Sequence, residues 1–312
     1  MRLVFAGTPE PAAIALEALL HSEHEILAVI TRPDAKRGRG RTLHPSPVKA
    51  LALEHGIEVL TPASLRPGTE DGDHLAQRLK DLAPDCIPVV AYGNLIGPNL
   101  LDIPQHGWVN LHFSVLPRWR GASPVQASIL AGDEHTGASV FQIEEGLDTG
   151  PVLEHFSEPM PPRATSESLL EHLSHKGATL LVHTMDALEA GTVQLKPQQG
   201  EASYAAKITV DDARLDFSDN AEVIDRKIRA LTPQPGAWAL LGEQRIKFGP
   251  VEVLEDEPAL DPGSIKVEKR RVLVGTASHA VVLGHIQPPG KKYMPAIDWA
   301  RGQHGLESKV FA

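Results

Sequence analysis

Asn110 and His112 stand two residues apart in the run W-V-N-L-H, where a short apolar stretch meets a loop rich in proline and glycine. Side chains alternate between the two faces of a strand, so these two would point the same way. A carboxamide donor beside a titratable imidazole can hold a developing oxyanion and move a proton. Asp148, in the downstream run G-L-D-T-G, could orient the imidazole and supply negative charge. With no nucleophilic serine or cysteine evident beside them, these residues indicate direct group transfer.

Each of the three also has an ordinary structural interpretation, because asparagine and aspartate cap turns and histidine often sits at the edge of a core. The residues alone leave catalysis and a plain turn equally open for Asp148. Asn110 and His112 follow an apolar run that is expected to be buried on both sides, so they need partners or a substrate. We expect a neighbouring carboxylate to raise the pKa of His112 above ~6.5, which would keep the imidazole protonated and able to donate near neutrality.

To bring these residues together, the fold must place the ends of several strands side by side. Short apolar runs alternate with segments of helical spacing, which predicts a Rossmann-like, mainly parallel α/β sheet with helices on both faces and ligands at the carboxyl ends of its strands. The expected strands are residues 2–6, 26–30, 86–91, 109–112, 138–143 and 152–156, and the expected helices are residues 12–20, 47–55, 74–82, 123–131 and 166–190.

The pattern changes after residue 190. Glycine, proline and glutamine gather in residues 191–207, which predicts a linker between a catalytic domain of residues 1–190 and a C-terminal domain of residues 208–312. After one helix at residues 220–231, short apolar runs at 237–241, 245–248, 263–267, 271–275 and 280–285 predict a small OB-like β-barrel.

Composition excludes several classes. A chain of 312 residues suits two domains, and its net charge of -10, most of it in residues 1–207, argues against indiscriminate coating of nucleic acid. The longest nearly apolar stretch, residues 86–101, is interrupted by proline and glycine, so no membrane span is expected. The single cysteine, Cys86, lies among apolar residues and is expected to be a core residue in a reducing compartment. No phosphate-binding glycine motif or metal-binding cluster stands out.

A basic loop follows the second expected strand. Lys36, Arg37, Arg39 and Arg41 lie near a single acid, Asp34, with glycines between them. On composition alone this is a solvated surface loop, but its guanidinium groups could also contact a phosphate backbone. A second, weaker basic set in the C-terminal part, for which ordinary surface charge is nearly as good an explanation, comprises Lys266, Lys269, Arg270, Arg271, Lys291 and Lys292.

The N-x-H pair, the following S-V-L-P-R-W-R-G-A-S-P-V-Q and the G-L-D-T-G loop are similar to the signature of the formyltransferases that use 10-formyltetrahydrofolate. The resemblance extends over nearly the whole chain, through F-A-G-T-P at residues 5–9, V-V-A-Y-G at 89–93 and Q-P-P-G-K-K-Y-M at 287–294. Phe113 stands where a glycine is usual, and Val115 replaces a leucine.

This resemblance implies that Asn110, His112 and Asp148 form a catalytic trio and that 10-formyltetrahydrofolate is the co-substrate, without a metal. It implies folate contacts from Val90, Tyr92, Ser114, Val115, Leu116 and Pro117. It also matches Arg39 to the central arginine of a clamp on the tRNA acceptor arm, flanked by Lys36, Arg37 and Arg41. The implied reaction formylates the free α-amino group of initiator methionyl-tRNA for translation initiation, in a cytoplasmic protein that is expected to be a monomer with no membrane contact.

Three alternatives remain at this point. The chain could formylate an amino-sugar nucleotide, which the basic loop and the C-terminal barrel disfavour. It could release formate from the same folate by admitting water in place of an amine. It could also be a catalytically silent tRNA-binding protein, against which the intact trio argues.

Overall fold

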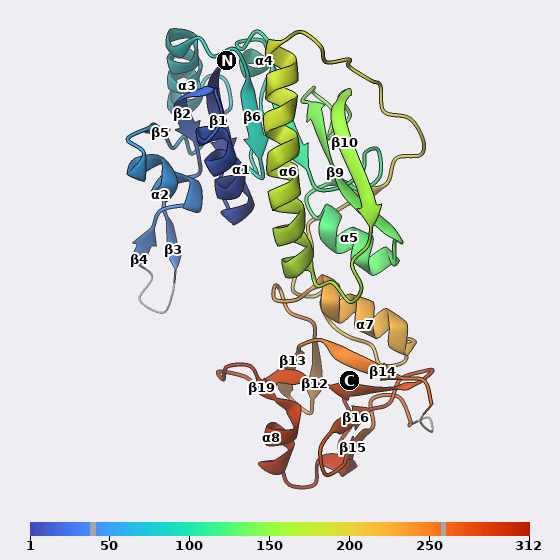
Figure 1. The fold of residues 1–312 in the computed structure, drawn as a ribbon. Helices are drawn as coiled ribbons and strands as arrows, with labels where there is room; N and C mark the ends of the chain where they lie inside the picture. The colour runs from blue at the N-terminus through green and yellow to red at the C-terminus, as the bar shows by residue number, and fades with distance from the viewer. Residues whose placement is uncertain (38–41, 257–259) are drawn as a thin grey trace. The chain divides into compact units, whose positions relative to one another are not determined.

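The computed structural model describes residues 1–37, 42–256 and 260–312 (Figure 1). The chain divides into two compact units. Unit 1 comprises Met1–Pro124, His135–Pro159 and Leu170–Tyr204, and unit 2 comprises Val125–Glu134, Met160–Leu169 and Ala205–Ala312. Within the described ranges, none of the helices has both the length and the apolar character that crossing a membrane requires.

Every strand and helix predicted before residue 190 is present, and the described residues up to 205 contain six further short elements that were not predicted. In chain order the elements are β1 (Arg2–Gly7), α1 (Glu10–Leu20), β2 (Glu25–Ile30), β3 (Ala35–Arg37), β4 (Thr42–His44), α2 (Pro47–Glu54), β5 (Glu58–Leu60), α3 (Glu70–Leu82), β6 (Ile87–Val90), α4 (Pro98–Leu101), β7 (Trp108–His112), β8 (Arg120–Gly121), α5 (Pro124–Ala131), β9 (His135–Gln142), β10 (Val152–Pro159), α6 (Ser166–Glu189) and β11 (Tyr204–Ala205).

One 7-stranded sheet forms the centre of unit 1, in the order β10-β9-β7-β6-β1-β2-β5 (Figure 1). The strands from β7 to β5 in this order are parallel to one another. β9 runs antiparallel to β7, and β10 runs antiparallel to β9. The predicted mainly parallel α/β sheet is therefore confirmed.

Side-chain caps start two of the helices. Ser46 accepts a hydrogen bond from the backbone N–H of Lys49 at 3.0 Å, which begins α2. Thr69 does the same for Gly72 at 3.2 Å, and α3 begins at Glu70, four residues before the predicted start. The first turn of α3 is acidic, which suits the positive end of the helix dipole.

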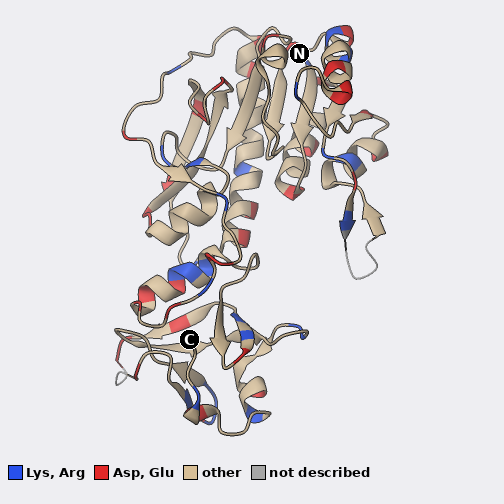
Figure 2. Ribbon diagram, turned by 180° about the vertical axis from the view of Figure 1, so that it is seen from behind, with Lys and Arg blue, Asp and Glu red and all other residues tan. Residues whose placement is uncertain are grey.

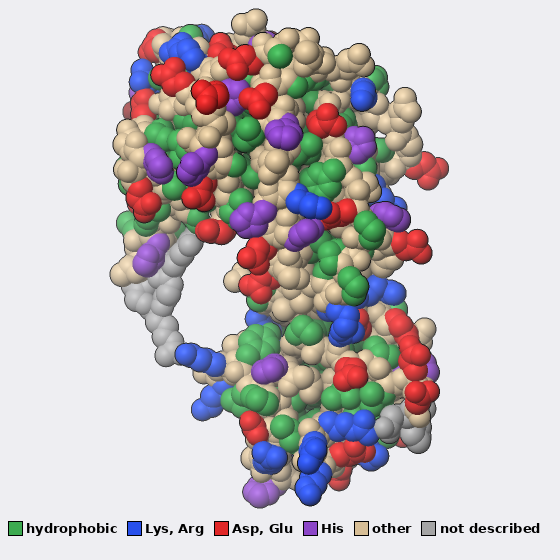
Figure 3. Space-filling view, in the orientation of Figure 1, with side chains coloured by type: hydrophobic (Ala, Val, Ile, Leu, Met, Phe, Trp, Pro, Cys, Tyr) green, Lys and Arg blue, Asp and Glu red, His purple; other side chains and the backbone are tan. Residues whose placement is uncertain are grey.

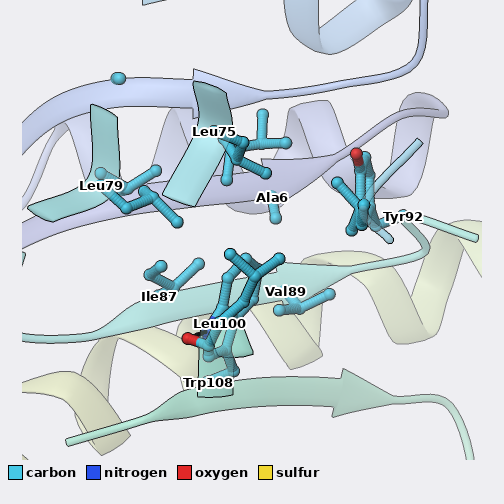
Figure 4. Packing of buried hydrophobic residues seen from close by; sticks show 12 residues of the cluster. Ala6, Leu75, Leu79, Ile87, Val89, Tyr92, Leu100 and Trp108 are labelled. Atoms are coloured by element: carbon cyan, nitrogen blue, oxygen red, sulfur yellow. Dashed lines mark hydrogen bonds between the residues drawn. The ribbon is translucent and has the colours of Figure 1, made fainter. Parts of the chain in front are cut away.

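The core on one face of the sheet combines strand residues with α3 and α4 (Figure 4). Leu75 and Leu79 of α3 point toward the sheet, where they pack with Ile87 of β6 and Trp108 of β7. Burying each such leucine contributes about 1.5–3 kcal/mol. Leu111 of β7 faces the other side, where α6 comes so close that a Cβ on Gly177 would lie 3.0 Å from its Cδ2.

Unit 2 contains two four-stranded antiparallel sheets, β12-β13-β18-β19 and β14-β17-β16-β15. Its elements after residue 205 are α7 (Ala221–Ala230), β12 (Trp238–Leu241), β13 (Gln244–Phe248), β14 (Val251–Leu254), β15 (Ile265–Val267), β16 (Val272–Val274), β17 (Ala280–Leu283), β18 (His285–Gln287), β19 (Met294–Pro295), α8 (Ala296–Arg301) and the short 3₁₀ helix η1 (Leu306–Ser308). The sequence predicted an OB-like β-barrel of short strands, and the structure confirms a C-terminal unit of small antiparallel sheets. Its aromatic core includes Phe248 and Phe311, with ring centroids 5.1 Å apart.

Two short segments of the predicted catalytic domain of residues 1–190, Val125–Glu134 and Met160–Leu169, belong to unit 2, and polar contacts hold the second of them. The carboxylate of Asp225 on α7, 6% exposed, pairs with Arg229 at 2.8 Å and with Arg163 at 3.2 Å. Ser166 donates a hydrogen bond to the Thr232 carbonyl at 2.7 Å.

Candidate active site

β7 carries two of the three predicted catalytic residues. In the sheet, Asn110 lies opposite Val89 of β6 and Phe141 of β9, while His112 is the last residue of the strand and lies opposite Ser139. Trp108, two residues before Asn110, is in the core cluster with α3 and α4. The alternation along the strand therefore directs Asn110 and His112 to that face, at the carboxyl end of the parallel strands, as predicted.

His112 is 6% exposed, and a backbone carbonyl sets its tautomer. Its Nε2 lies 2.8 Å from the carbonyl oxygen of Trp119. A carbonyl can only accept, so Nε2 carries the proton and Nδ1 of the neutral ring has a free lone pair. Nδ1 faces Oδ2 of Asp148 at 3.8 Å. The imidazole thus presents a base toward a carboxylate.

Burial lowers the pKa of His112 below its ordinary value of 6.5. The carboxylate of Asp148 and the hydrogen bond to Trp119 both raise this pKa, but desolvation of the charged ring outweighs them. The expectation of a raised pKa and a protonated imidazole is therefore wrong in sign. At neutral pH the side chain is a neutral base.

A histidine titration tests this conclusion. We expect the pKa of His112, measured by NMR on ring-labelled protein and assigned with His112→Asn, to lie below 6.5. In Asp148→Asn it should fall further, because the charge that raises it has been removed. A value above 6.5 in the unmodified protein would show that the carboxylate outweighs burial.

Asp148 occupies a strained turn whose carboxylate is held in place. Its φ of 51° lies in the left-handed region, which non-glycine residues seldom adopt. Oδ2 accepts a hydrogen bond from the backbone N–H of Gly121 at 2.7 Å while facing Nδ1 of His112. The residue therefore forms a turn and also brings its charge to the imidazole, two interpretations that the sequence left as alternatives.

Asn110 is half-buried, and its carboxamide forms no hydrogen bond with another side chain or backbone group in the described parts of the chain. Its N–H groups are free to donate to a ligand. A free carboxamide and a neutral imidazole on one face of a strand suit a carbonyl-containing group: the first can donate to the oxygen, and the second can accept a proton.

The predicted folate-contacting residues lie around the same strand ends. Val90 is fully buried at the end of β6, and Tyr92, 2% exposed, follows it. The run from Ser114 to Pro117 begins two residues after His112. Its backbone is held by Ser139, a residue that sequence reasoning missed. Ser139 Oγ donates to the Ser114 carbonyl at 2.8 Å and accepts from the Leu116 N–H at 3.1 Å. Ser139 lies opposite His112 in the sheet, a register that the sequence did not indicate.

The basic residues divide into two groups. Lys36 and Arg37 lie on β3, which pairs with β4 as a hairpin (Figure 2). Arg39 and Arg41 lie outside the described residues. In unit 2, lysine and arginine side chains gather on one surface (Figure 3), but Lys266 and Arg271 both pair with Glu268, at 2.8 Å and 2.6 Å. Part of this second set is therefore neutralised locally.

Cys86 is fully buried, and burial raises the pKa of its thiol to about 12. The thiol therefore stays protonated and is not a nucleophile. This confirms the expectation that Cys86 is a core residue.

Comparison with known families covers both units. Residues 1–185 match the family described as formyl transferase, and residues 207–304 match its C-terminal domain. The chain belongs to the formyl transferase family. This formyl transferase is 59% identical to a protein from Corynebacterium aurimucosum named methionyl-tRNA formyltransferase, over 99% of this chain and 97% of that protein.

Solved structures share the fold of this formyl transferase at low sequence identity. The methionyl-tRNA formyltransferase of Clostridium thermocellum has a TM-score of 0.55 at 15% identity, covering 91% of this chain and 98% of that one. An N-formyltransferase of Helicobacter canadensis, in complex with folinic acid and dTDP-3-aminofucose, has a TM-score of 0.66 at 18% identity, covering 92% and 98%. At this level of sequence identity, these similarities support only a shared fold.

Proposed function

We propose that this formyl transferase transfers the formyl group of 10-formyltetrahydrofolate to the free α-amino group of initiator methionyl-tRNA, giving the formylated tRNA for translation initiation. The observation that carries the proposal is 59% identity, over almost the full length of both chains, to a protein named methionyl-tRNA formyltransferase. This relationship favours tRNA over an amino-sugar nucleotide as the acceptor. Residues 1–190 would bind folate and perform the transfer, and residues 208–312 would bind tRNA.

The geometry supports roles for the three site residues. As the amine attacks the formyl carbon, Asn110 donates a hydrogen bond to the oxygen that becomes negative. His112, neutral because it is buried, accepts a proton from the attacking amine at Nδ1. Asp148, 3.8 Å away, stabilises the resulting imidazolium. The same proton then passes to N10 of the folate as the bond from N10 to the formyl carbon breaks, so no proton is gained or lost overall.

The folate would lie along Ser114, Val115, Leu116 and Pro117, with Val90 and Tyr92 beside it. These residues follow the ends of β6 and β7, where ligands bind in open α/β sheets. Ser139 supports the backbone of the run and Phe141 packs with Leu116, so the segment is held before a ligand arrives. Pre-formed contacts of this kind reduce the entropy lost on binding.

The hairpin of β3 and β4 would contact the acceptor arm of the tRNA. A pocket of about 390 Å³ at its base is lined by residues that include Thr8, Arg32, His44 and Ser46. The Thr8 hydroxyl oxygen is buried and has no hydrogen-bond partner among the described residues. Hydroxyl, imidazole and guanidinium groups in one pocket are suited to a ribose or phosphate of the acceptor end.

Arg39, central in the basic loop, gives a prediction about tRNA affinity. We expect Arg39→Ala to weaken methionyl-tRNA binding and to reduce the slope of log K against log salt by about 1, because one phosphate contact is lost. The folate KM should not change. Binding curves at several salt concentrations measure the slope, with the exposed Lys80→Ala on α3 as a control. An unchanged slope in Arg39→Ala would reject the phosphate contact.

A product assay tests the proposed function. Purified protein is incubated with the formyl donor and with methionyl-tRNA, with an amino-sugar nucleotide, or with no acceptor. We expect a formylated product only with methionyl-tRNA. A formylated sugar would identify the sugar as acceptor, and free formate without acceptor would identify a hydrolase. No product in any arm, with methionyl-tRNA still bound in a binding assay, would identify a non-catalytic tRNA-binding protein.

A further inference from the structure

We propose that Gln198 is a positioning residue, which holds the Asp148 turn against His112 through hydrogen bonds to the backbone of that turn. The inference rests on the proposed function for its catalytic consequence. Gln198 belongs to residues 196–204, which we call the bracing segment and which lie within the stretch predicted from sequence as a linker. In the structure this segment is hydrogen-bonded to the Asp148 turn, to the backbone that orients His112, and to β10.

The first connection is to the turn itself. Gln198 Nε2 donates to the carbonyl oxygens of Asp148 and Gly150, each at 2.8 Å. Its Oε1 accepts from Nε and Nη2 of Arg120, at 3.1 Å and 2.7 Å. Both N–H groups and both acceptor positions of the carboxamide are therefore used. A half-buried glutamine with every polar position satisfied fixes the two chains that it joins.

The second connection is to the backbone that orients the imidazole. Ser203 Oγ accepts from the N–H of Trp119 at 2.9 Å, and the Ser203 carbonyl accepts from the N–H of Arg120 at 2.8 Å. The carbonyl of Trp119 in turn accepts from His112 Nε2 at 2.8 Å. Thus the bracing segment holds the group that sets the tautomer of His112 as well as the turn that carries Asp148.

The third connection anchors the segment. Lys196 and Val152, the first residue of β10, exchange both of their backbone hydrogen bonds, at 2.8 Å and 2.9 Å. The segment is therefore tied to the edge of the sheet two residues before Gln198. Because the segment is anchored here, Gln198 is held at a fixed position beside the turn between β9 and β10.

The backbone of Asp148 needs these stabilising hydrogen bonds because its conformation is unfavourable. At a φ of 51° the residue relaxes unless its surroundings fix it. The Gly121 N–H bonds one carboxylate oxygen of Asp148, but it does not bond the backbone of the turn. Gln198 binds the backbone carbonyl of the strained residue itself and the carbonyl two residues later, and so fixes the direction of Asp148 toward Nδ1 of His112.

Variants of Gln198 and of its neighbour test the inference. Gln198→Ala removes the hydrogen bonds of the Gln198 side chain to Arg120 and to the two carbonyls of the turn. Gln198→Glu keeps an oxygen for Arg120 but replaces the N–H donors with a carboxylate oxygen that repels the two carbonyls. Gln199→Ala, at the adjacent exposed position, is the matched control. Gln198→Met, which keeps the length of the side chain, serves if the alanine variant does not fold. Unfolding midpoints establish that each variant is folded.

We expect Gln198→Ala and Gln198→Glu to lower kcat about 10- to 100-fold, with the KM values for folate and methionyl-tRNA within about twofold of normal, because a displaced group slows the reaction more than it weakens binding. Gln199→Ala should have normal kcat. In Asp148→Asn, adding Gln198→Ala should cause little further loss, since both changes remove the same interaction.

A second readout does not depend on the substrate. The pKa of His112 should fall in Gln198→Ala, in the same direction as in Asp148→Asn, because the carboxylate that raises it has moved away. A normal kcat together with an unchanged pKa of His112 in folded Gln198 variants would overturn the inference. If the unmodified protein fails to formylate methionyl-tRNA, the proposed function fails, while the titration still decides whether Gln198 positions Asp148.

Discussion

His112→Ala is expected to lower kcat by at least 10²- to 10³-fold at saturating folate and methionyl-tRNA, the loss that follows removal of one preorganised catalytic group. Asn110→Ala and Asp148→Asn should lie in the same range. His112→Ala removes the base that accepts the amine proton, and Asn110→Ala removes a hydrogen-bond donor to the oxyanion. Asp148→Asn removes the charge that stabilises the imidazolium. Single-turnover measurements separate this chemical step from product release.

These losses should occur without a change in fold, which circular dichroism and unfolding midpoints can check. His74→Ala, an exposed histidine on α3, is the control and should retain normal turnover. Since the three residues act as a unit, the double variant of Asn110 and His112 should be less impaired than the product of the two single losses predicts. Near-normal turnover in all three single variants would reject the assignment of the site.

Gly150→Ala is expected to lower kcat about 10²-fold, because an error of about 1 Å in a catalytic group can have an effect of this size. A Cβ at this position would lie 1.8 Å from the carbonyl oxygen of Gln142, which is backbone at the end of β9 and cannot move aside as a side chain could. The turn must therefore shift, and it carries Asp148 two residues earlier. The measurement is kcat together with the pKa of His112, which should fall.

Gly302→Ala is the control for that prediction. A Cβ there would lie 3.5 Å from the Trp299 carbonyl, an ordinary contact, and its φ of -88° suits alanine. We expect this variant to have normal kcat. Normal kcat and a normal His112 titration in folded Gly150→Ala would mean that the position of the turn does not govern the reaction.

The centre of unit 1 was predictable, since β1, β6 and β7 are apolar runs that are buried almost throughout and the longer helices carry regular apolar spacing. The early start of α3 was missed because it depends on Thr69 capping a first turn without apolar residues. In unit 2, residues 280–285 were predicted as one strand. The structure divides them between β17 and β18 at Gly284, where a Cβ would lie 2.7 Å from the carbonyl of Pro250.

The candidate site was predictable only as far as local geometry reaches. The spacing of Asn110 and His112 predicted a shared face because alternation along a strand is local. The direction in which the pKa of His112 shifts was not predictable, because it depends on how deeply the surrounding chain buries the ring. Gln198, fifty residues from Asp148 in sequence, has no local signal, since its role depends on contacts that only the folded chain creates.

The most direct measurement is a structure of the protein with a 10-formylfolate analogue that cannot transfer its formyl group. We expect the formyl oxygen to lie about 2.7–3.2 Å from Nδ2 of Asn110, with His112 Nδ1 open to the side from which an amine attacks and Asp148 beside it. A formyl group bound elsewhere, or one from which Asn110 and His112 both turn away, would contradict it.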